Sequence, residues 1–151
     1  MAPPSKTTRR RILGIATSVR KTLNEQLLYC TPTGECFNAT IALSQKLQAA
    51  GIPHRIVSGT WHGPVEDPEL DPSNLADLVH VWIEFPQHDN AVLDITADQF
   101  SAVPEVWFPA SRKFYEPEEH ITVRPDRGPP GLRRRAFTLD TFVRSYRRKR
   151  A

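Results

Sequence analysis

The first hydrophobic pattern along the chain has a helical period. Apolar residues recur three or four positions apart between residues 9 and 28, and Arg and Lys occupy the opposite face. This spacing predicts an amphipathic helix over residues 9–28, with its apolar positions at Ile12, Ile15, Ala16, Val19, Leu23 and Leu27. The turn Pro-Thr-Gly at residues 32–34 ends the pattern.

A second helix is predicted from about Glu35 to Ala50. Gly51 stands where a helix commonly ends in the left-handed conformation, and Pro53 prevents the helix from continuing. One apolar stripe runs along this helix and comprises Cys36, Leu43, Leu47 and Ala50.

After the helices the pattern alternates, as it does in strands. Residues 54–61 are strand-like, and residues 79–85 alternate between an aliphatic row and a row of His80, Trp82 and Glu84. The turn PQHDN joins this strand to AVLDI at residues 91–95 as an antiparallel hairpin. The acidic, proline-containing residues 62–78 predict a long surface loop. Helices followed by antiparallel strands indicate an α+β fold, with the N-terminal helices packed on a small sheet.

The 151 residues are enough for one domain with its own core. We expect residues 1–8 to be disordered and residues 9–137 to form the domain. Aromatic-rich loops follow the hairpin, and residues 138–151 are predicted to form a basic amphipathic helix on or beside the domain. Gly59 lies inside a predicted strand, where glycine often marks a bulge or a close approach.

The pattern favours neither a membrane span nor a secretory signal. No apolar run is long enough to cross a bilayer, so we expect no membrane partner. The apolar part of the N-terminus is interrupted by Gly14, Thr17 and Ser18, which favours an amphipathic helix over a secretory signal. The two cysteines, Cys30 and Cys36, are most simply reduced thiols of a cytoplasmic protein, although they could pair.

The net charge of +3 conceals a segregation of charge along the chain. Residues 1–35 hold six Lys/Arg and two acids, residues 36–100 hold two and nine, and residues 101–151 hold twelve and six. The basic ends could pair with the acidic middle or could hold an acidic partner. The first interpretation is favoured, and nucleic acid is not expected, because no nucleic-acid-binding module surrounds the tail RSYRRKR.

Three residues carry candidate chemistry. Cys36 is placed on the first turn of a helix, where unpaired N–H groups and the helix dipole stabilise a thiolate. His80 lies on a strand opposite the aliphatic row, and Asp94 follows the apolar run of the neighbouring strand, so the two could be near neighbours across the hairpin. Asp94 would then orient the imidazole, and the imidazolium would hold Cys36 as a thiolate.

The segments GECFNATIALSQKLQAAGIPHRIVSGTW, HVWIEF and LDITADQF resemble the transglutaminase-like superfamily of papain-like thiol enzymes. The resemblance covers about residues 34–100. Cys36, His80 in an H-x-W motif and Asp94 in a D-x-T motif match the family's Cys, His and Asp in order. The resemblance implies a papain-like core and acyl transfer on peptide or protein amides, by hydrolysis or by transamidation, with no cofactor and no metal.

The chain departs from the family pattern in two places. Phe37 follows the cysteine where the family usually has Trp or another bulky aromatic residue. The family's side-chain oxyanion donor lies upstream of the cysteine, and Gln26 and Tyr29 are the nearest candidates here, neither at a diagnostic spacing. Trp82 and Trp61 are candidate substrate-binding residues, and Trp82 could also shield the thiolate–imidazolium pair from water.

Structural explanations exist for each residue taken alone. Cys36 could be a small apolar filler, His80 a hydrogen-bonded histidine of the sheet, and Asp94 the N-cap of the following segment unless Asp98 takes that role. Cys30 is interpreted as an idle thiol, and a zinc site with His54 and His62 lacks the usual ligand spacing. The alternative function is a non-catalytic binding module whose basic termini hold an acidic protein or nucleic acid.

Overall fold

The computed structural model of the chain describes residues 2–27 and 36–121, except for the side chains of Gln26, Leu27 and Cys36. The predicted helix over residues 138–151 lies outside the described residues, as do Tyr29 and Cys30.

The N-terminal helix, α1, spans Lys6–Leu27 and begins earlier than the sequence pattern predicted. Ser5 provides the start, because its side-chain oxygen accepts the backbone N–H of Thr8 at 3.1 Å and its carbonyl accepts that of Arg9 at 2.8 Å. The expectation that residues 1–8 are disordered is therefore wrong for residues 6–8, which form the first turn of α1. Within the described ranges, no helix combines the length and apolarity needed to span a membrane.

The second helix, α2, spans Cys36–Ala49, within one residue of its predicted ends. Gly51 closes it with a φ of 73°, as predicted. The N–H of Gly51 donates to the carbonyl of Gln48, and the N–H of Ile52 donates to the carbonyl of Leu47, at 3.0 Å each. These two bonds satisfy carbonyls at the helix end and turn the chain toward the sheet.

The sheet contains four described strands in the order β3-β2-β1-β4, with every neighbouring pair antiparallel. The strands are β1 (Arg55–Trp61), β2 (Val79–Phe85), β3 (Ala91–Leu93) and β4 (Tyr115–Ile121). The predicted hairpin of β2 and β3 is confirmed, and Asp89 and Asn90 have the positive φ angles of a tight turn. Short 3₁₀ helices occupy Leu75–Leu78 (η1), Pro86–His88 (η2) and Ala97–Gln99 (η3).

Strand β4 lies where we predicted only loops. Its sequence, YEPEEHI, contains a proline and consecutive polar residues, so it lacks the alternation that marks a half-buried strand. All its residues from Glu116 to His120 are exposed, and the strand forms an edge of the sheet. Edge strands tolerate proline because one side of the backbone needs no ladder partner.

Gly59 on β1 has the close approach that its position predicted. The pairing of β1 with β4 shifts register between Ser58 and Gly59. A Cβ atom at Gly59 would overlap the carbonyl oxygen of Glu116 and lie 2.7 Å from the Trp82 ring. The sheet therefore requires glycine here, where β4 and a buried indole come close to the backbone.

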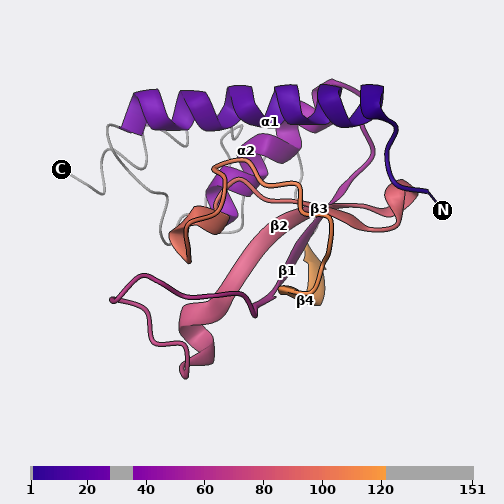
Figure 1. Cartoon of the computed structure of the whole chain (residues 1–151). Coiled ribbons are helices and arrows are strands. Elements are labelled where there is room, and N and C mark those ends of the chain that lie inside the picture. Colours follow the sequence, from indigo (N-terminus) through magenta and orange to yellow (C-terminus); the bar gives the residue numbers. More distant parts are fainter. Residues whose placement is uncertain (1, 28–35, 122–151) are drawn as a thin grey trace.

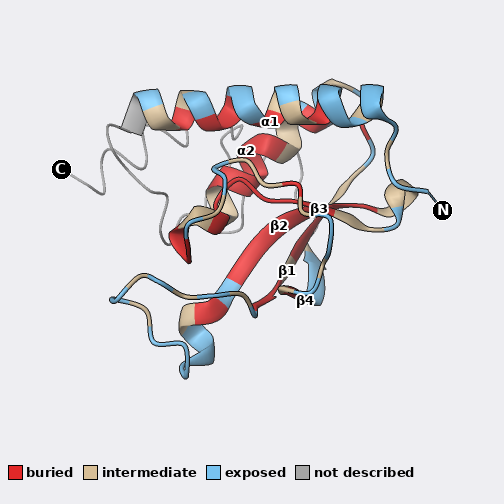
Figure 2. Ribbon diagram, viewed as in Figure 1, coloured by how far each residue is buried: buried red, intermediate tan, exposed pale blue. Residues whose placement is uncertain are grey.

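The protein has hydrophobic layers on both faces of the sheet (Figures 1 and 2). On one face α2 packs against β2, and α1 lies across α2. Val81, Ile83 and Phe85 join this layer, whereas Trp82 joins the cluster on the opposite face. The predicted alternation is confirmed, and the row of His80, Trp82 and Glu84 is buried as well. Its polar atoms therefore need partners within the protein.

Arg20 fastens α1 to the segment that follows β3. It is buried, although the sequence pattern placed the arginines of this helix on its polar face. Its guanidinium makes two bonds to Asp98, at 2.7 and 2.8 Å, and one to the carbonyl of Ile95 at 2.7 Å. This bidentate pair fixes the turn between β3 and η3 against the helical layer.

Candidate active site

His80 and Asp94 form a buried pair. The Nε2 atom of His80 lies 2.6 Å from Oδ2 of Asp94, and both side chains are completely buried. His80 comes from β2, and Asp94 follows β3 directly. The predicted neighbourhood of these two residues is therefore confirmed.

Asp94 leaves the ladder of β3 to reach this position. Its backbone pairs with Trp107 through two hydrogen bonds, of 2.9 and 2.8 Å, instead of continuing the pairing with β2. Its Oδ1 atom accepts the N–H of Thr96 at 2.9 Å, which closes a small turn. One carboxylate thus stabilises the turn with one oxygen and contacts His80 with the other.

The second oxygen of Asp94 has another donor. The hydroxyl of Tyr115, the first residue of β4, donates to Oδ2 at 2.8 Å. Burial raises the pKa of Asp94, but the charge and hydrogen bond of His80, together with the bonds from Thr96 and Tyr115, outweigh it and hold this pKa below its ordinary value. Burial, reinforced by the charge of Asp94, raises the pKa of Tyr115, so its hydroxyl stays protonated.

These bonds determine the protonation of the imidazole. Asp94 is ionised and accepts hydrogen bonds only, so Nε2 of His80 carries a proton and donates it. In the neutral ring, Nδ1 is then an acceptor, and the side-chain N–H of Gln99 lies 3.1 Å from it. A ring held in this way has Nδ1 as the nitrogen that can exchange a proton with a reacting group.

Aromatic rings surround His80. The ring of Phe100 contacts it edge to face with centroids 4.9 Å apart, and the rings of Trp82 and Trp61 lie at 5.9 and 6.1 Å. Trp61 and Trp82 are both completely buried, so neither presents a surface to a substrate. The expectation that they bind substrate is corrected accordingly, and we assign both to the wall that excludes water from the His80–Asp94 pair.

Cys36 is the first residue of α2, as the sequence predicted. Thr40 follows it by one helical turn, and its hydroxyl donates to the carbonyl of Val81 at 3.3 Å. Val81 is the neighbour of His80 on β2. The N-terminal turn of α2 is therefore bound to the strand that carries the histidine. The Cys36 side chain itself lies outside the described part of the structure, as does the side chain of Gln26.

A sequence model of the transglutaminase-like superfamily matches residues 14–116, more than half of the chain. The chain belongs to the transglutaminase-like superfamily. A search of curated proteins and a search of solved structures each gave no significant match. The two helices and the antiparallel sheet agree with the α+β, papain-like core that the resemblance implied.

Two polar contacts of this transglutaminase-like site were not predicted. Tyr115 lies in the segment for which the sequence predicted only aromatic-rich loops, and its bond to Asp94 depends on the unpredicted strand β4. Gln99 carried no signal beyond its place after the D-x-T motif. Asp98, considered as a helix cap, instead binds Arg20, and η3 has no side-chain cap.

A second buried carboxylate lies near the site. Glu84 accepts the indole N–H of Trp82 at 2.8 Å and a guanidinium N–H of Arg112 at 3.1 Å. Arg112 also donates to the carbonyl of Asn90. This network holds the loop before β4 against β2, and it supports the indole that packs beside His80.

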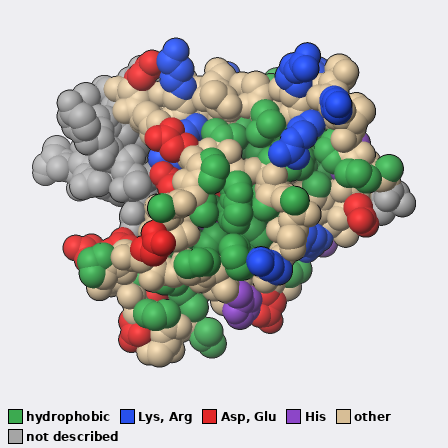
Figure 3. Space-filling model, viewed as in Figure 1, with side chains coloured by type: hydrophobic (Ala, Val, Ile, Leu, Met, Phe, Trp, Pro, Cys, Tyr) green, Lys and Arg blue, Asp and Glu red, His purple; other side chains and the backbone are tan. Residues whose placement is uncertain are grey.

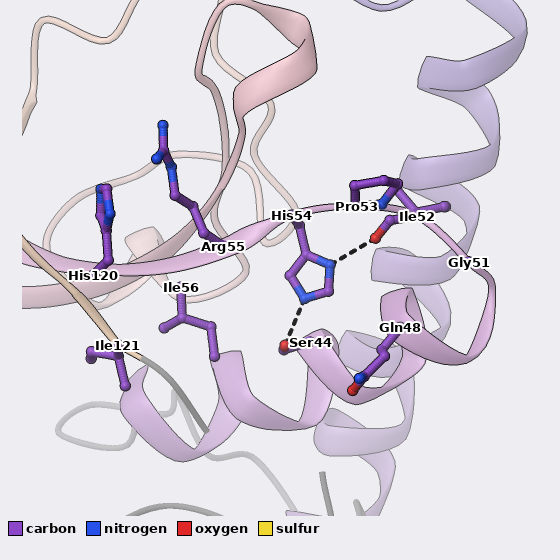
Figure 4. A pocket seen from close by; sticks show the side chains of 10 residues that line it. All are labelled: Ser44, Gln48, Gly51, Ile52, Pro53, His54, Arg55, Ile56, His120 and Ile121. Atoms are coloured by element: carbon purple, nitrogen blue, oxygen red, sulfur yellow. Dashed lines mark hydrogen bonds between the residues drawn. The ribbon is translucent and has the colours of Figure 1, made fainter. Parts of the chain in front are cut away.

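A different polar pocket lies at the far end of α2 and has a volume of about 510 Å³. Figure 4 shows the His54 ring between the Ser44 hydroxyl and the Ile52 carbonyl, at 2.6 and 2.8 Å. Burial lowers the pKa of His54 more than the bond to Ile52 raises it, which favours a neutral ring that accepts from Ser44. Ser44 lies in the interior of α2, away from the N-terminus of that helix, where backbone N–H groups could stabilise the oxyanion of an acyl-transfer reaction. We interpret the pair as a link between α2 and β1.

The described residues contain no group of three or more His, Cys, Asp or Glu placed to hold a metal ion.

Proposed function

We propose that this transglutaminase-like domain is a thiol-dependent acyl-transfer enzyme that acts on peptide or protein amides. Cys36 is the nucleophile, His80 is its acid and base, and Asp94 orients His80. The thiolate sulfur bonds to the amide carbon, the C–N bond breaks, and Nδ1 of His80 gives its proton to the departing amine. Water or an amine then attacks the thioester, His80 takes the proton of the attacking group, and the thiolate is restored.

The buried His80–Asp94 pair is the observation that carries the proposal. Burying two charges costs solvation free energy, and such a pair often adds no stability over apolar residues of similar size. This site retains the pair and surrounds it with aromatic rings, next to the strand carbonyl that binds the first turns of α2. Activation of a cysteine at the beginning of that helix would explain why the site retains a buried pair that is costly in solvation free energy.

The position of Cys36 supports the role of nucleophile independently. The first N–H groups of an α-helix have no partners within the helix, and the helix dipole is positive at this end. Such an environment can lower a thiol pKa from ~8.5 into the range ~3.5–7.5. The same backbone groups are suited to stabilise the oxyanion of a tetrahedral intermediate.

The proposal is tested by the reactivity of Cys36. We expect iodoacetamide to alkylate Cys36 at pH 6 at least about tenfold faster than it alkylates N-acetylcysteine, because the thiolate fraction of an ordinary thiol is small there. Peptide mapping by mass spectrometry separates Cys36 from Cys30, which serves as an internal control. Equal rates for Cys36 and the free thiol would exclude an activated nucleophile.

Turnover is tested separately with a glutamine-containing peptide and hydroxylamine. Hydroxylamine traps an acyl-enzyme as a hydroxamate, and ammonia release reports hydrolysis as well. We expect both products to disappear in Cys36→Ala. Product formation by Cys36→Ala at the wild-type rate would exclude Cys36 as the nucleophile.

The non-catalytic alternative has one structural observation in its favour. Arg10, Arg11 and Lys46 line a groove of about 500 Å³ beside α1. A module that binds an acidic partner through this groove predicts an affinity that falls with salt and is unaffected by Cys36→Ala. Inert Cys36 together with salt-sensitive binding of poly-glutamate would favour this function over the enzyme.

A further inference from the structure

An acidic pocket borders the aromatic wall of His80. It has a volume of about 350 Å³ and is formed by the loop after β1 and the segment around η3. Its lining includes Glu66, Asp67, Asp98, Gln99, Phe100 and Ser101. Building on the proposed function, we infer that this pocket binds a cationic side chain, arginine or lysine, of the substrate peptide as a recognition group that does not itself react.

The pocket carries uncompensated negative charge. Asp98 is neutralised by its bidentate pair with Arg20. Among the described residues, neither Glu66 nor Asp67 forms an ion pair. Acidic side chains also gather at the lower left of Figure 3, where Figure 1 shows the loop after β1, whereas Lys and Arg lie mainly over α1. A cation entering here would meet two carboxylates.

The two carboxylates are held in place before any ligand binds. The N–H of Glu66 donates to the carbonyl of Phe100 at 2.6 Å, and its side chain accepts the N–H of Ala102 at 2.8 Å. Asp67 accepts the N–H of Glu69 at 2.9 Å. A carboxylate can accept about four hydrogen bonds, so capacity remains on both groups for an ammonium or guanidinium. This preorganisation reduces the entropic cost of binding.

Ser101 gives an independent indication of a ligand. Its side chain is buried, with 7% exposed, and its Oγ has no hydrogen-bond partner within the described part of the chain. A buried hydroxyl without a partner has lost its hydrogen bonds to water on folding without replacing them, which is unfavourable. Ser101 lines the same pocket as the two carboxylates. An N–H group of a bound cation would provide the missing hydrogen bond.

The pocket shares two residues with the candidate active site. Gln99 lines the pocket and lies 3.1 Å from Nδ1 of His80. Phe100 also lines it, and its ring packs edge to face on the imidazole. Only Gln99 or Phe100 therefore lies between His80 and a side chain held in the pocket. The bound side chain can then belong to a residue close in the peptide to the amide that reacts.

The inference is tested by binding, which requires no turnover. Full-length Cys36→Ala protein labelled with ¹⁵N is titrated with N-acetyl-arginine methylamide and with the citrulline analogue, which has a similar shape and no charge. We expect saturable amide shifts at residues 66–67 and 98–103, with a Kd at least about tenfold lower for the arginine compound, because one charged contact can contribute this much. A parallel pair, N-acetyl-lysine methylamide and its Nε-acetylated form, shows which cation is preferred.

The variant Glu66→Gln/Asp67→Asn removes the charge and keeps the oxygen atoms that accept Ala102 and Glu69. We expect it to fold and to lose the difference between arginine and citrulline. The matched control is Glu69→Gln, an exposed acid of the same loop outside the pocket lining, which should keep the difference. Equal binding of charged and neutral compounds, shifts at other sites or undiminished selectivity in the double variant would each overturn the inference. Since Cys36 is already replaced, these results do not depend on whether the protein is an enzyme.

Discussion

The hydroxyl of Tyr115 donates a 2.8 Å hydrogen bond to Oδ2 of Asp94, the oxygen that also contacts His80. Tyr115 begins β4 at one side of the sheet, and Asp94 follows β3 at the other. The bond therefore connects the two outer strands through the candidate site. Because Tyr115 remains protonated, it is a permanent donor to the carboxylate.

Replacing Tyr115 by Phe removes this donor and keeps the ring that packs beside Trp61 and Trp82. We expect the free energy of unfolding to fall by about 1–3 kcal/mol, as for other hydrogen bonds to charged groups. The carboxylate should also stabilise the imidazolium less well, so alkylation of Cys36 at pH 6 should slow. Urea unfolding and iodoacetamide kinetics measure the two effects.

Thr22→Val is the control for the loss of a hydroxyl, because Thr22 donates to Ser18 on the surface of α1. Thr22→Val should change neither the free energy of unfolding nor the rate of Cys36 alkylation appreciably. If Tyr115→Phe behaves like Thr22→Val, the phenol contributes nothing to the site.

Asp94→Asn keeps the size of the side chain and removes its charge. We expect a loss of about 3–5 kcal/mol in unfolding free energy, which is typical when one partner of a buried pair is removed. The pH profile of Cys36 alkylation should move toward that of an ordinary thiol. Glu84→Gln removes the neighbouring buried carboxylate and should leave that profile in place, since Glu84 binds Trp82 and Arg112.

Asp94→Asn should also change how the free energy of unfolding depends on pH in the acid range. The pKa of Asp94 is lower in the folded state, so its contribution to stability is present above the ordinary pKa of ~3.9 and is lost as the pH falls through the lowered folded value. Urea unfolding in this range should show a steeper loss of stability for the wild type than for Asp94→Asn. Parallel curves would contradict the assigned charge of Asp94.

His54 makes stability depend on pH in a different range. Its pKa is lowered by burial, so the folded state binds a proton less tightly than the unfolded chain does. Stability should therefore be complete above the ordinary histidine pKa of ~6.5 and should fall as the pH drops below it. Urea unfolding between pH 7.5 and 5 should show this slope in the wild type and a smaller one in His54→Gln.

His120 provides the comparison, because it is an exposed residue lining the same pocket. His120→Gln should retain the slope of the wild type. An unchanged slope in His54→Gln would show that another group is responsible.

Gly59→Ala tests the close approach of β4 to β1. The new methyl group would overlap the carbonyl of Glu116 and press on the Trp82 ring, so we expect a loss of about 3 kcal/mol or more in unfolding free energy. Gly14→Ala is the matched control, because a Cβ there meets nothing within 4 Å and Gly14 lies inside α1. It should stabilise the protein by about 0.5–1 kcal/mol. Equal effects of the two substitutions would contradict the observed packing.

Much of the fold follows from periodicity. The 3.6-residue spacing and Gly51 predicted α2 within one residue at each end, and alternation predicted the limits of β2. The same alternation placed His80 in one row with Trp82 and Glu84. These features are local, since propensity, apolar spacing and turn residues all act over a few positions.

The remaining features depend on contacts between distant segments. Arg20 looks like a surface residue in its helix, but it is buried against Asp98, 78 residues later. Strand β4 has no alternation, because it is an edge strand with most side chains exposed. Tyr115 and Gln99 therefore reach Asp94 and His80 through a topology that the sequence pattern did not predict.

The strand order has a consequence for how the protein is made. The β2–β3 hairpin can close as soon as its own residues have left the ribosome, but β4 must return to β1, whose Trp61 pairs with Tyr115. Until residue 115 has emerged, Asp94 lacks its phenolic partner. A nascent chain can therefore form its helices and the β2–β3 hairpin before the hydrogen bond from Tyr115 to Asp94 is in place, so the carboxylate beside His80 receives its last donor only when the outer strand has paired.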